Sequence, residues 1–243
     1  GIGNGAKHGV LIKGGEVMDR MNQVDTMVFD KTGTLTQGTT AVTTFISLEE
    51  EDEKSLAYLM AIEKESDHPL AKAIVAYLGE KNIRNPYPVQ STTVLEGRGS
   101  QAMVQDEEVL IGNERLLKEQ ALTIKPKTQK EIQAIKEQGN SIVLVTVSGK
   151  LRFVIGVSDE IRPEAKKALM KLRKMGIKRF VMLTGDNQIT AQGVATQLGI
   201  DEVKAELLPA DKVKEVQKLK DTGHSVAFVG DGINDSPSIA LAD

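Results

Sequence analysis

The sequence contains no cysteine and no tryptophan, and it has few other aromatic residues, namely five phenylalanines and three tyrosines in 243 residues. Without cysteine the chain can form neither a disulfide scaffold nor a thiolate metal site, and a catalytic thiol is excluded. The scarcity of aromatic rings argues against a platform on which unpaired nucleobases would stack. No apolar run approaches the roughly 18 residues that a membrane-spanning helix needs, and no pattern of a secretory signal is present.

The sequence also has no large excess of charge of either sign, because it contains 31 basic and 34 acidic residues and its formal net charge is -3. This balance offers no broad electrostatic attraction to nucleic acid or to an anionic membrane, and no nucleic-acid partner is expected. The hydrophobic share of 40% and the charged share of 27% are those of a folded globular chain. The length suits one large or two small domains.

The first and last parts of the chain alternate short apolar segments with helical patterns. The apolar segments, each expected to be a buried strand, are 26–30, 179–183, 202–205 and 225–229. The helical patterns that separate the later segments span 163–174, 187–198 and 209–221. This alternation predicts an α/β domain with a doubly wound parallel sheet, which binds ligands at the carboxyl ends of its strands.

The middle of the chain, residues 45–155, is predicted to be a second domain inserted into the first, which then comprises 1–44 and 156–243. Helices are expected over 54–65, 69–80, 113–120 and 126–138, and strands near 92–96, 101–105 and 141–147. Strands and helices are grouped here rather than alternating. The grouping predicts an α+β domain with an antiparallel sheet and helices on one face.

The heptapeptide Asp30-Lys-Thr-Gly-Thr-Leu-Thr36 follows the first predicted strand. An acid at the carboxyl end of a buried parallel strand lies in the crevice where open α/β sheets bind ligands. Lys31 adds positive charge, and Gly33 permits a tight turn whose backbone N–H groups can hold a phosphate. Asp30 is therefore a candidate nucleophile that would form an aspartyl-phosphate. A simple Asp helix cap does not account for the whole heptapeptide.

Four further polar motifs occur at predicted strand ends and helix starts. They are Asp159-Glu-Ile-Arg162, Thr184-Gly-Asp-Asn187, Leu207-Leu-Pro-Ala-Asp-Lys212 and Gly230-Asp-Gly-Ile-Asn-Asp235. Each alone is weak, since a lone Gly-Asp-Gly is more often a turn than a metal site. Their order along the chain, taken with the heptapeptide, indicates a single phosphoryl-transfer site.

With these motifs the sequence resembles the P-type cation-transporting ATPases, which share a catalytic core with the haloacid dehalogenase-like phosphatases. The resemblance implies that Asp30 is the phosphorylated residue, beside Lys31, and that Thr32 binds Mg²⁺ through its backbone carbonyl. Soluble relatives usually carry a second Asp, acting as general acid and base, at the position of Thr32. Because threonine transfers protons poorly at neutral pH, the phosphoenzyme is expected to persist long enough to drive a conformational change.

The resemblance also assigns roles to the motif that follows the second predicted strand and to the lysine near the start of the last helix. Thr184, in the motif with Gly185 and Asp186, would hold the phosphoryl group through its hydroxyl. Lys212 would neutralise phosphate charge, a role that suits the compact ammonium of lysine.

For the remaining motifs the resemblance implies metal and nucleotide contacts. Asp231 would bind Mg²⁺, and Asn234 and Asp235 would support the phosphate and metal. Asp159 and Arg162, at the return into the first domain, would help to dock the nucleotide. The expected Mg²⁺ ligands of the protein are thus Asp30, Thr32 and Asp231.

Within the inserted domain, Ser66-Asp-His-Pro-Leu70 resembles the His-Pro signature of the heavy-metal-transporting branch, whose His packs near the adenine. His68 before Pro69 is equally consistent with a simple helix cap. The remaining residues that resemble this branch's nucleotide pocket are Glu63, Gly97, Gly99, Gly112 and Asn113. They favour the heavy-metal branch. The spacing between Gly99 and Gly112 is long for this branch, and the extra residues 105–108 are expected to lengthen a hairpin there.

The resemblance covers essentially the whole chain but only part of such a pump. It implies ATP as substrate and Mg²⁺ as cofactor. The actuator and transmembrane domains of the same polypeptide, and the bound heavy-metal ion, would lie outside this chain. The chain is therefore expected to be a soluble cytoplasmic loop of an integral membrane protein. The amino-acid sequences of segments 8–15 and 181–186 resemble the Zn²⁺/Cd²⁺ subgroup more closely than the Cu⁺ subgroup.

Three alternatives stay open. The first is a Cu⁺-transporting member of the same branch. The second is a soluble haloacid dehalogenase-like phosphatase with a cap domain, which Thr32 and the His-Pro insert disfavour. The third is a non-catalytic nucleotide-binding module, which the presence of Asp30, Thr184, Lys212 and Asp231 disfavours.

Overall fold

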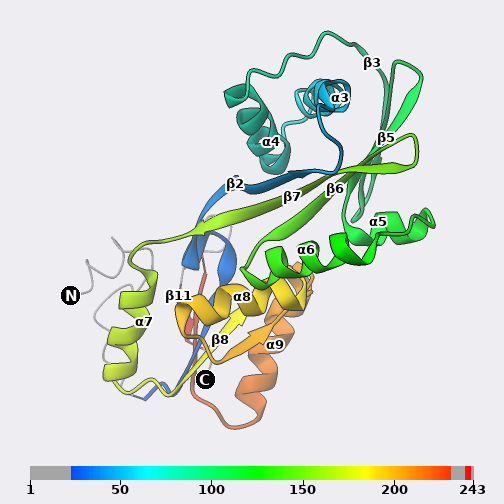
Figure 1. Ribbon diagram of the computed structural model, residues 1–243. Helices are drawn as coiled ribbons and strands as arrows, with labels where there is room; N and C mark the ends of the chain where they lie inside the picture. The colour runs from blue at the N-terminus through cyan, green and yellow to red at the C-terminus, as the bar shows by residue number, and fades with distance from the viewer. Residues whose placement is uncertain (1–22, 231–238, 242–243) are drawn as a thin grey trace. The chain divides into compact units, whose positions relative to one another are not determined.

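The structure is a computed structural model that describes residues 23–230 and 239–241 (Figure 1). The chain forms two compact units, of which one comprises Gly1–Thr39 with Asp159–Asp243 and the other Thr40–Ser158. We call them the α/β unit and the inserted unit. Within the described residues no helix is both long and apolar enough to cross a bilayer.

The chain passes between the units twice, each time within a long strand. The first passage lies in β2 (Thr36–Ser47) and the second in β7 (Lys150–Ile161). The sequence placed these borders at 44/45 and 155/156, which fall inside the two strands. Neither strand was predicted from the sequence.

The sheet of the α/β unit has the strand order β11-β10-β1-β8-β9. Its strands are β1 (Thr26–Asp30), β8 (Arg179–Leu183), β9 (Glu202–Lys204), β10 (Val226–Val229) and β11 (Ile239–Leu241). β1 is central and pairs in parallel with β8 and β10, while β11 joins the edge antiparallel. The predicted parallel sheet is confirmed, and β1 ends in the middle of its carboxyl edge.

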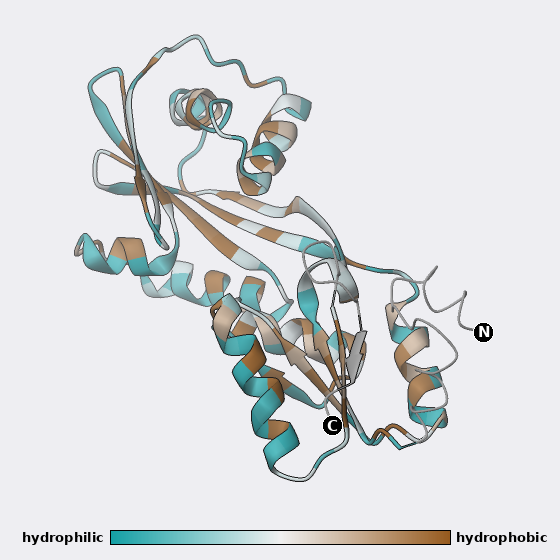
Figure 2. Cartoon of the chain, turned by 180° about the vertical axis from the view of Figure 1, so that it is seen from behind, coloured by the Kyte–Doolittle hydropathy of each residue, from teal (hydrophilic) through white to brown (hydrophobic). Residues whose placement is uncertain are grey.

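Helices cover both faces of this sheet: α7 (Ala165–Lys174) and α8 (Gln188–Leu198) on one face, and α9 (Pro209–Asp221) on the other. The side-chain alternation of β1 explains the arrangement, because Phe29 packs with Leu169 and Val194 while Val28 packs with Leu219. The helices accordingly carry hydrophobic and hydrophilic residues on different faces (Figure 2). This is the predicted doubly wound architecture.

The sheet of the inserted unit has the order β2-β7-β6-β5-β4-β3. The strands not yet given are β3 (Val89–Leu95), β4 (Gly99–Val104), β5 (Glu107–Gly112) and β6 (Ser141–Val147). The successive pairs from β3 to β7 are antiparallel, as predicted.

Helices lie on both faces of this second sheet, so the prediction of helices on one face is wrong. They are α3 (Glu53–Glu63) and α4 (Pro69–Glu80) on one face, and α5 (Glu114–Glu119) and α6 (Pro126–Glu137) on the other. In β6, Val143 and Val145 face α3 and α4, whereas Ile142 and Leu144 face the α5–α6 side. β6 is therefore apolar on both faces, which indicates a strand that is covered on both sides. The prediction of helices on one face relied on the grouping of elements and did not use this feature.

The β4–β5 hairpin has a tight turn, and residues 105–108, which were expected to lengthen the hairpin, form this turn and the first two residues of β5. Gln105 and Asp106 both have positive φ, at 51° and 62°, as in a two-residue hairpin turn of type I′. Val104 pairs with Glu107 on either side of this turn, and Gly99 pairs with Gly112 at the other end of the hairpin. The extra residues lengthen the strands and leave the glycines opposite each other.

Candidate functional site

Asp30 is the last residue of β1, and the chain turns sharply after it in the segment Lys31–Leu35. Thr32 has φ -70° and ψ 123°, and Gly33 has φ 79° and ψ -10°. These are the two central positions of a type II turn, whose second position requires positive φ and so favours glycine. The turn sends the chain back into β2 and leaves Asp30 at the carboxyl edge of the sheet.

Side chains from a distant part of the α/β unit hold this turn. The Thr36 hydroxyl lies 2.5 Å from Asp159 Oδ2, to which it donates, and it accepts from the Gly33 N–H at 3.2 Å. Arg162 Nη2 donates to the Gly33 carbonyl at 2.9 Å, and its backbone N–H donates to the Leu35 carbonyl. Asp159 and Arg162 thus position the nucleophile turn, a role that the sequence did not reveal. Their predicted contact with a nucleotide stays a prediction.

Two ion pairs lie at this edge of the sheet. Lys212 Nζ lies 2.7 Å from Asp30 Oδ1, and Lys31 Nζ lies 2.7 Å from Asp186 Oδ2. Each candidate carboxylate is thereby matched by one lysine, and Lys31 is buried. The second oxygen of Asp30 has no partner among the described residues.

Backbone hydrogen bonds explain how Lys212 reaches Asp30 from 182 positions along the chain. The Leu207 N–H donates to the Thr184 carbonyl, and the Glu206 N–H donates to the Asp186 carbonyl. A Cβ on Gly185 would lie 3.2 Å from the Leu207 carbonyl oxygen, so glycine suits this close approach. The loop after β8 therefore places the first turn of α9 beside β1.

Thr184 is arranged to donate to a ligand. Its hydroxyl oxygen accepts from the Asp186 N–H at 3.1 Å. Its hydroxyl hydrogen has no acceptor among the described residues, so it can point at an incoming oxygen. Thr184, Asp186, Lys31, Lys212 and Asp30 are thus gathered at one edge of the sheet.

The oxygen donors at this edge suit Mg²⁺. The carboxylate of Asp30 and the backbone carbonyl of Thr32 are hard oxygen ligands, and Mg²⁺ binds through one or two carboxylates together with water and phosphate. The other predicted residues of this site, Asp231, Asn234 and Asp235, lie outside the described residues.

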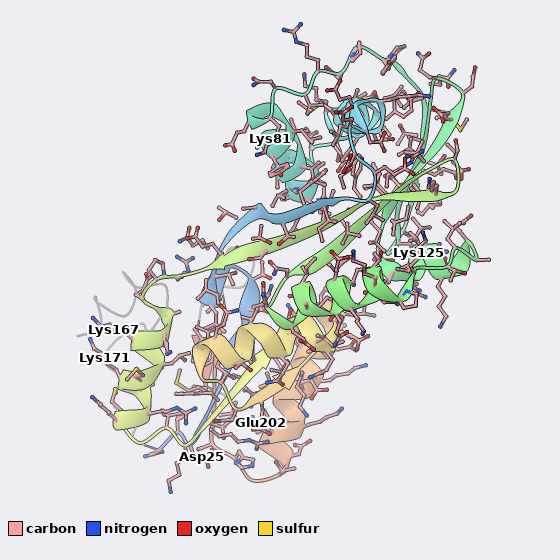
Figure 3. All side chains as sticks on the ribbon, viewed as in Figure 1. Asp25, Lys81, Lys125, Lys167, Lys171 and Glu202 are labelled. Atoms are coloured by element: carbon pink, nitrogen blue, oxygen red, sulfur yellow. The ribbon has the colours of Figure 1, made fainter. Side chains whose placement is uncertain are left out.

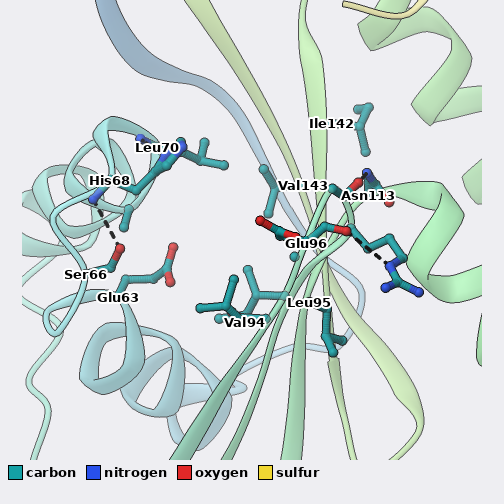
Figure 4. Close-up of a pocket in the computed structure, with 17 residues that line it drawn as sticks. Glu63, Ser66, His68, Leu70, Val94, Leu95, Glu96, Asn113, Ile142 and Val143 are labelled. Carbon is teal, nitrogen blue, oxygen red and sulfur yellow. Dashed lines mark hydrogen bonds between the residues drawn. The ribbon is translucent and has the colours of Figure 1, made fainter. Parts of the chain in front are cut away.

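A separate cleft of about 560 Å³ lies in the inserted unit between the α3–α4 connection and the sheet (Figure 4). Its lining includes six of the eight residues that the sequence had proposed for the nucleotide, namely Glu63, His68, Gly97, Gly99, Gly112 and Asn113, but neither Asp159 nor Arg162. It also includes Ser66, Val94 and Val143, to which the sequence had assigned no role. Val94 is 76% exposed, which is unusual for a large apolar side chain.

Glu63 is the one strongly perturbed acid of the described chain. Its side chain is buried, with 6% exposure for the residue, and no described group forms a hydrogen bond to it. Loss of hydration raises the pKa of the Glu63 carboxyl to about 7. Figure 4 shows Glu63 on the helix side of the cleft, with Val94 across from it. The carboxyl can therefore offer a hydrogen-bond donor when protonated and an acceptor when ionised.

His68 both caps a helix and lines the cleft. Its Nδ1 accepts from the Leu70 N–H at 3.1 Å, and Pro69 is the first residue of α4. In the neutral ring this bond leaves the hydrogen on Nε2, which can donate to a ligand. The cap reading of the sequence is confirmed, and it does not compete with a place in the cleft.

Gly99 and Gly112 are required by the close approach of two backbones, whereas Gly97 has nothing within 4 Å of an added Cβ. A Cβ on Gly99, whose φ is 142°, would lie 2.0 Å from the Ile111 carbonyl oxygen, and one on Gly112 would lie 2.2 Å from the Arg98 carbonyl oxygen. Asn113 fixes the adjacent turn, because its Oδ1 accepts from the Leu116 N–H and its Nδ2 donates to the Gly97 carbonyl. Both polar groups of Asn113 are thus used inside the protein, and the residue shapes the cleft wall.

Comparison with known proteins identifies the chain. The family model of haloacid dehalogenase-like hydrolases matches residues 24–243. A solved structure of the catalytic domain of the CPx-ATPase CopB-B is 31% identical with a TM-score of 0.67, and the match covers 97% of this chain and 83% of that one. The chain belongs to the haloacid dehalogenase-like hydrolases, among the P-type ATPase catalytic domains.

Longer P-type ATPases resemble this catalytic domain over its entire length. A manganese-exporting P-type ATPase of Mycobacterium bovis and a zinc-exporting one of Mycobacterium marinum are each 43% identical over all of this chain. A copper-exporting P-type ATPase of Staphylococcus haemolyticus is 42% identical, again over all of it. The match covers 34%, 33% and 30% of these relatives, so the chain spans about a third of their length.

The buried carboxyl of this P-type ATPase domain predicts a pH-dependent stability. Since the folded-state pKa of Glu63 is about 7 against a usual 4.5, folding binds a proton between these values, and stability falls as pH rises through this window. From about pH 5.5 to about pH 8 the loss should be about 2 kcal/mol. Glu63→Gln should remove it, as measured by urea unfolding at both pH values. The exposed neighbour variant Glu65→Gln should keep the wild-type dependence, and an unchanged dependence in Glu63→Gln would contradict the assignment.

The glycine pair predicts a second, steric effect on this domain. Gly99→Ala should destabilise the inserted unit by more than about 2 kcal/mol, because its methyl group meets backbone that has no room to move. Gly79→Ala is the matched control, since Gly79 lies in α4 with nothing within 4 Å of an added Cβ. It should be neutral or slightly stabilising. Equal thermal unfolding midpoints for the two variants would show that the close approach is not a constraint.

Proposed function

We propose that this chain is the ATP-binding and phosphorylated region of a metal-exporting P-type ATPase, and that Asp30 accepts the γ-phosphoryl group of ATP. The observation that carries the proposal is the Asp30 carboxylate at the central strand end, paired with Lys212. A carboxylate in the ligand crevice of a parallel sheet can attack phosphorus, and a mobile lysine can follow the charge to the phosphoryl oxygens.

In the proposed reaction, the free oxygen of Asp30 forms a bond to the γ-phosphorus while the bond to the bridging oxygen of ADP breaks. ADP leaves with the electron pair, and no proton has to be removed because the nucleophile is already a carboxylate. Lys212 and the Thr184 hydroxyl would stabilise charge on the transferring group. Mg²⁺, held by Asp30, Thr32 and the predicted ligand Asp231, supplies further neutralisation of phosphate charge when bound.

The cleft of the inserted unit is the proposed place of the nucleotide base. Its volume of about 560 Å³ lies in the range of small-molecule sites, and it combines apolar Val94 and Val143 with the polar Glu63 and His68. The related CopB-B catalytic domain has been studied for its response to nucleotide binding. Asp159 and Arg162, which hold the turn after Asp30, are also proposed to contact the nucleotide.

The parent protein would couple this phosphorylation to export of a heavy-metal ion across a membrane. The chain would form its cytoplasmic part and would act with actuator and transmembrane domains of the same polypeptide. We propose Zn²⁺, Cd²⁺ or a related divalent ion as cargo, with Cu⁺ as the alternative. Similarity to exporters of manganese, zinc and copper is nearly equal. The ion would bind outside this chain, which has no cysteine and three histidines.

Asp30→Asn should abolish phosphorylation and leave nucleotide binding intact. Wild type incubated with Mg²⁺ and ATP or acetyl phosphate should gain one acid-stable, hydroxylamine-labile phosphoryl group by intact-mass spectrometry, and the variant none. Both should bind ATP in a titration. Rapid turnover of small phosphate esters would point instead to a soluble phosphatase, and nucleotide binding without an adduct from either donor would point to a binding module.

Lys212→Gln should slow formation of the phosphoenzyme by about 10²–10³-fold, because one charged donor to the transferring group is lost. Lys214→Gln is the matched control, since it removes the same charge from an exposed position of the same helix. It should leave the rate within about two-fold. Single-turnover phosphorylation at saturating ATP measures both, and equal slowing in the two variants would remove Lys212 from the proposed chemistry.

A further inference from the structure

One face of α7 carries positive charge that the proposed chemistry does not use. The opposite face of the helix packs in the core of the α/β unit through Ala165, Leu169 and Leu172. The exposed positions of the helix and of the turn that follows it include Lys166, Lys167, Lys171, Lys174 and Lys178, which we call the α7 lysine face. None of these five has an ion-pair partner among the described residues, in a chain whose net charge is -3.

The α7 lysine face is not explained by the stability of the helix. Lys166 and Lys167 lie in the first turn, where the helix dipole is positive, and the acid nearest to them on this helix is the N-cap residue Glu164. Lys167 and Lys171 are four residues apart within the helix, and like charges at this spacing repel. Only the lysines of the last turn are favoured by the dipole. Repulsion between these lysines therefore destabilises the helix, and no described ion pair offsets it.

Apolar atoms are exposed among these lysines. Met170 is 53% and Met175 is 46% exposed, and they are two of the five large exposed hydrophobic residues of the described chain. Met170 is within one turn of Lys166, Lys167, Lys171 and Lys174. Figure 3 shows Lys167 and Lys171 projecting away from the ribbon. Lysine ammonium groups beside exposed apolar side chains suit contact with an anionic lipid surface, while the apolar face of α7 itself stays in the protein core.

The composition of the face favours lipid over protein as its partner. Protein interfaces are depleted in lysine and enriched in arginine and aromatic residues. The one arginine of α7 is already occupied, because Arg173 pairs with Asp201 at 3.0 Å and its guanidinium lies 4.5 Å from the centre of the Phe180 ring. Flexible lysines suit mobile anionic headgroups, which need no fixed hydrogen-bond geometry.

We propose that the α7 lysine face binds the anionic headgroups of a lipid bilayer. The inference rests on the proposed function, which places the chain in a membrane-embedded protein, and it adds a contact that would restrain the α/β unit next to that membrane. Such a contact adds about five-fold in binding per lysine near the surface and weakens as salt screens the charges.

The test is sedimentation of the 243-residue chain with vesicles of phosphatidylcholine, alone or with about 30% phosphatidylglycerol. Wild type should bind only the anionic vesicles and should be released by high salt. The double variant Lys167→Gln/Lys171→Gln should bind about 25-fold more weakly, at about five-fold for each lysine. The control, Lys127→Gln/Lys130→Gln, removes the same charge from exposed positions of α6 and should bind within about two-fold of wild type.

Equal losses in the two double variants would overturn the proposal, since binding would then follow net charge alone. Absence of binding to anionic vesicles would also overturn it. So would equally tight binding of soluble polyglutamate, which would assign the face to an acidic protein. Because the assay contains no nucleotide, its outcome is independent of phosphoenzyme formation. A failed phosphorylation experiment with intact vesicle binding would reject the proposed function and keep the lipid contact.

Discussion

The ion pair between Lys212 and Asp30 is the interaction that depends on the whole arrangement of the α/β unit. It joins the end of the central strand to the first turn of α9, across 182 positions of the chain. For the pair to form, β1 has to lie between β8 and β10, and the loop after β8 has to hold the chain that enters α9. The same geometry gives the Asp30 carboxylate one cation within reach and one oxygen without a partner among the described residues, which suits the proposed phosphoryl transfer.

The turn after Asp30 shows how a nucleophile is kept in place without a rigid helix or strand. Gly33 allows the reversal, but the Thr36 hydroxyl, Asp159 and Arg162 fix it. Asp159 and Arg162 belong to the segment in which β7 returns to the α/β unit. The position of the turn that carries Asp30 therefore depends on the segment in which the chain returns to the α/β unit.

The two sites of the chain use opposite electrostatic strategies. At the sheet edge of the α/β unit, Asp30 and Asp186 are each matched by one lysine. In the cleft of the inserted unit, Glu63 is buried without a partner, and loss of hydration alone raises its pKa. With a pKa of about 7, the buried carboxyl of Glu63 exchanges a proton with its surroundings near neutral pH.

Much of this protein was determined by its sequence. The alternation of apolar runs and helical periods predicted the parallel sheet, and the heptapeptide from Asp30 placed the nucleophile at a strand end, because both depend on residues that are neighbours in the chain. The long strands β2 and β7, the helices on both faces of the second sheet, and the tight hairpin at Gln105 and Asp106 were decided by tertiary structure. So were the partners of Asp30, Thr36 and Asn113, since hydrogen bonds, burial and backbone contacts between residues far apart in the chain exist only once the chain has folded.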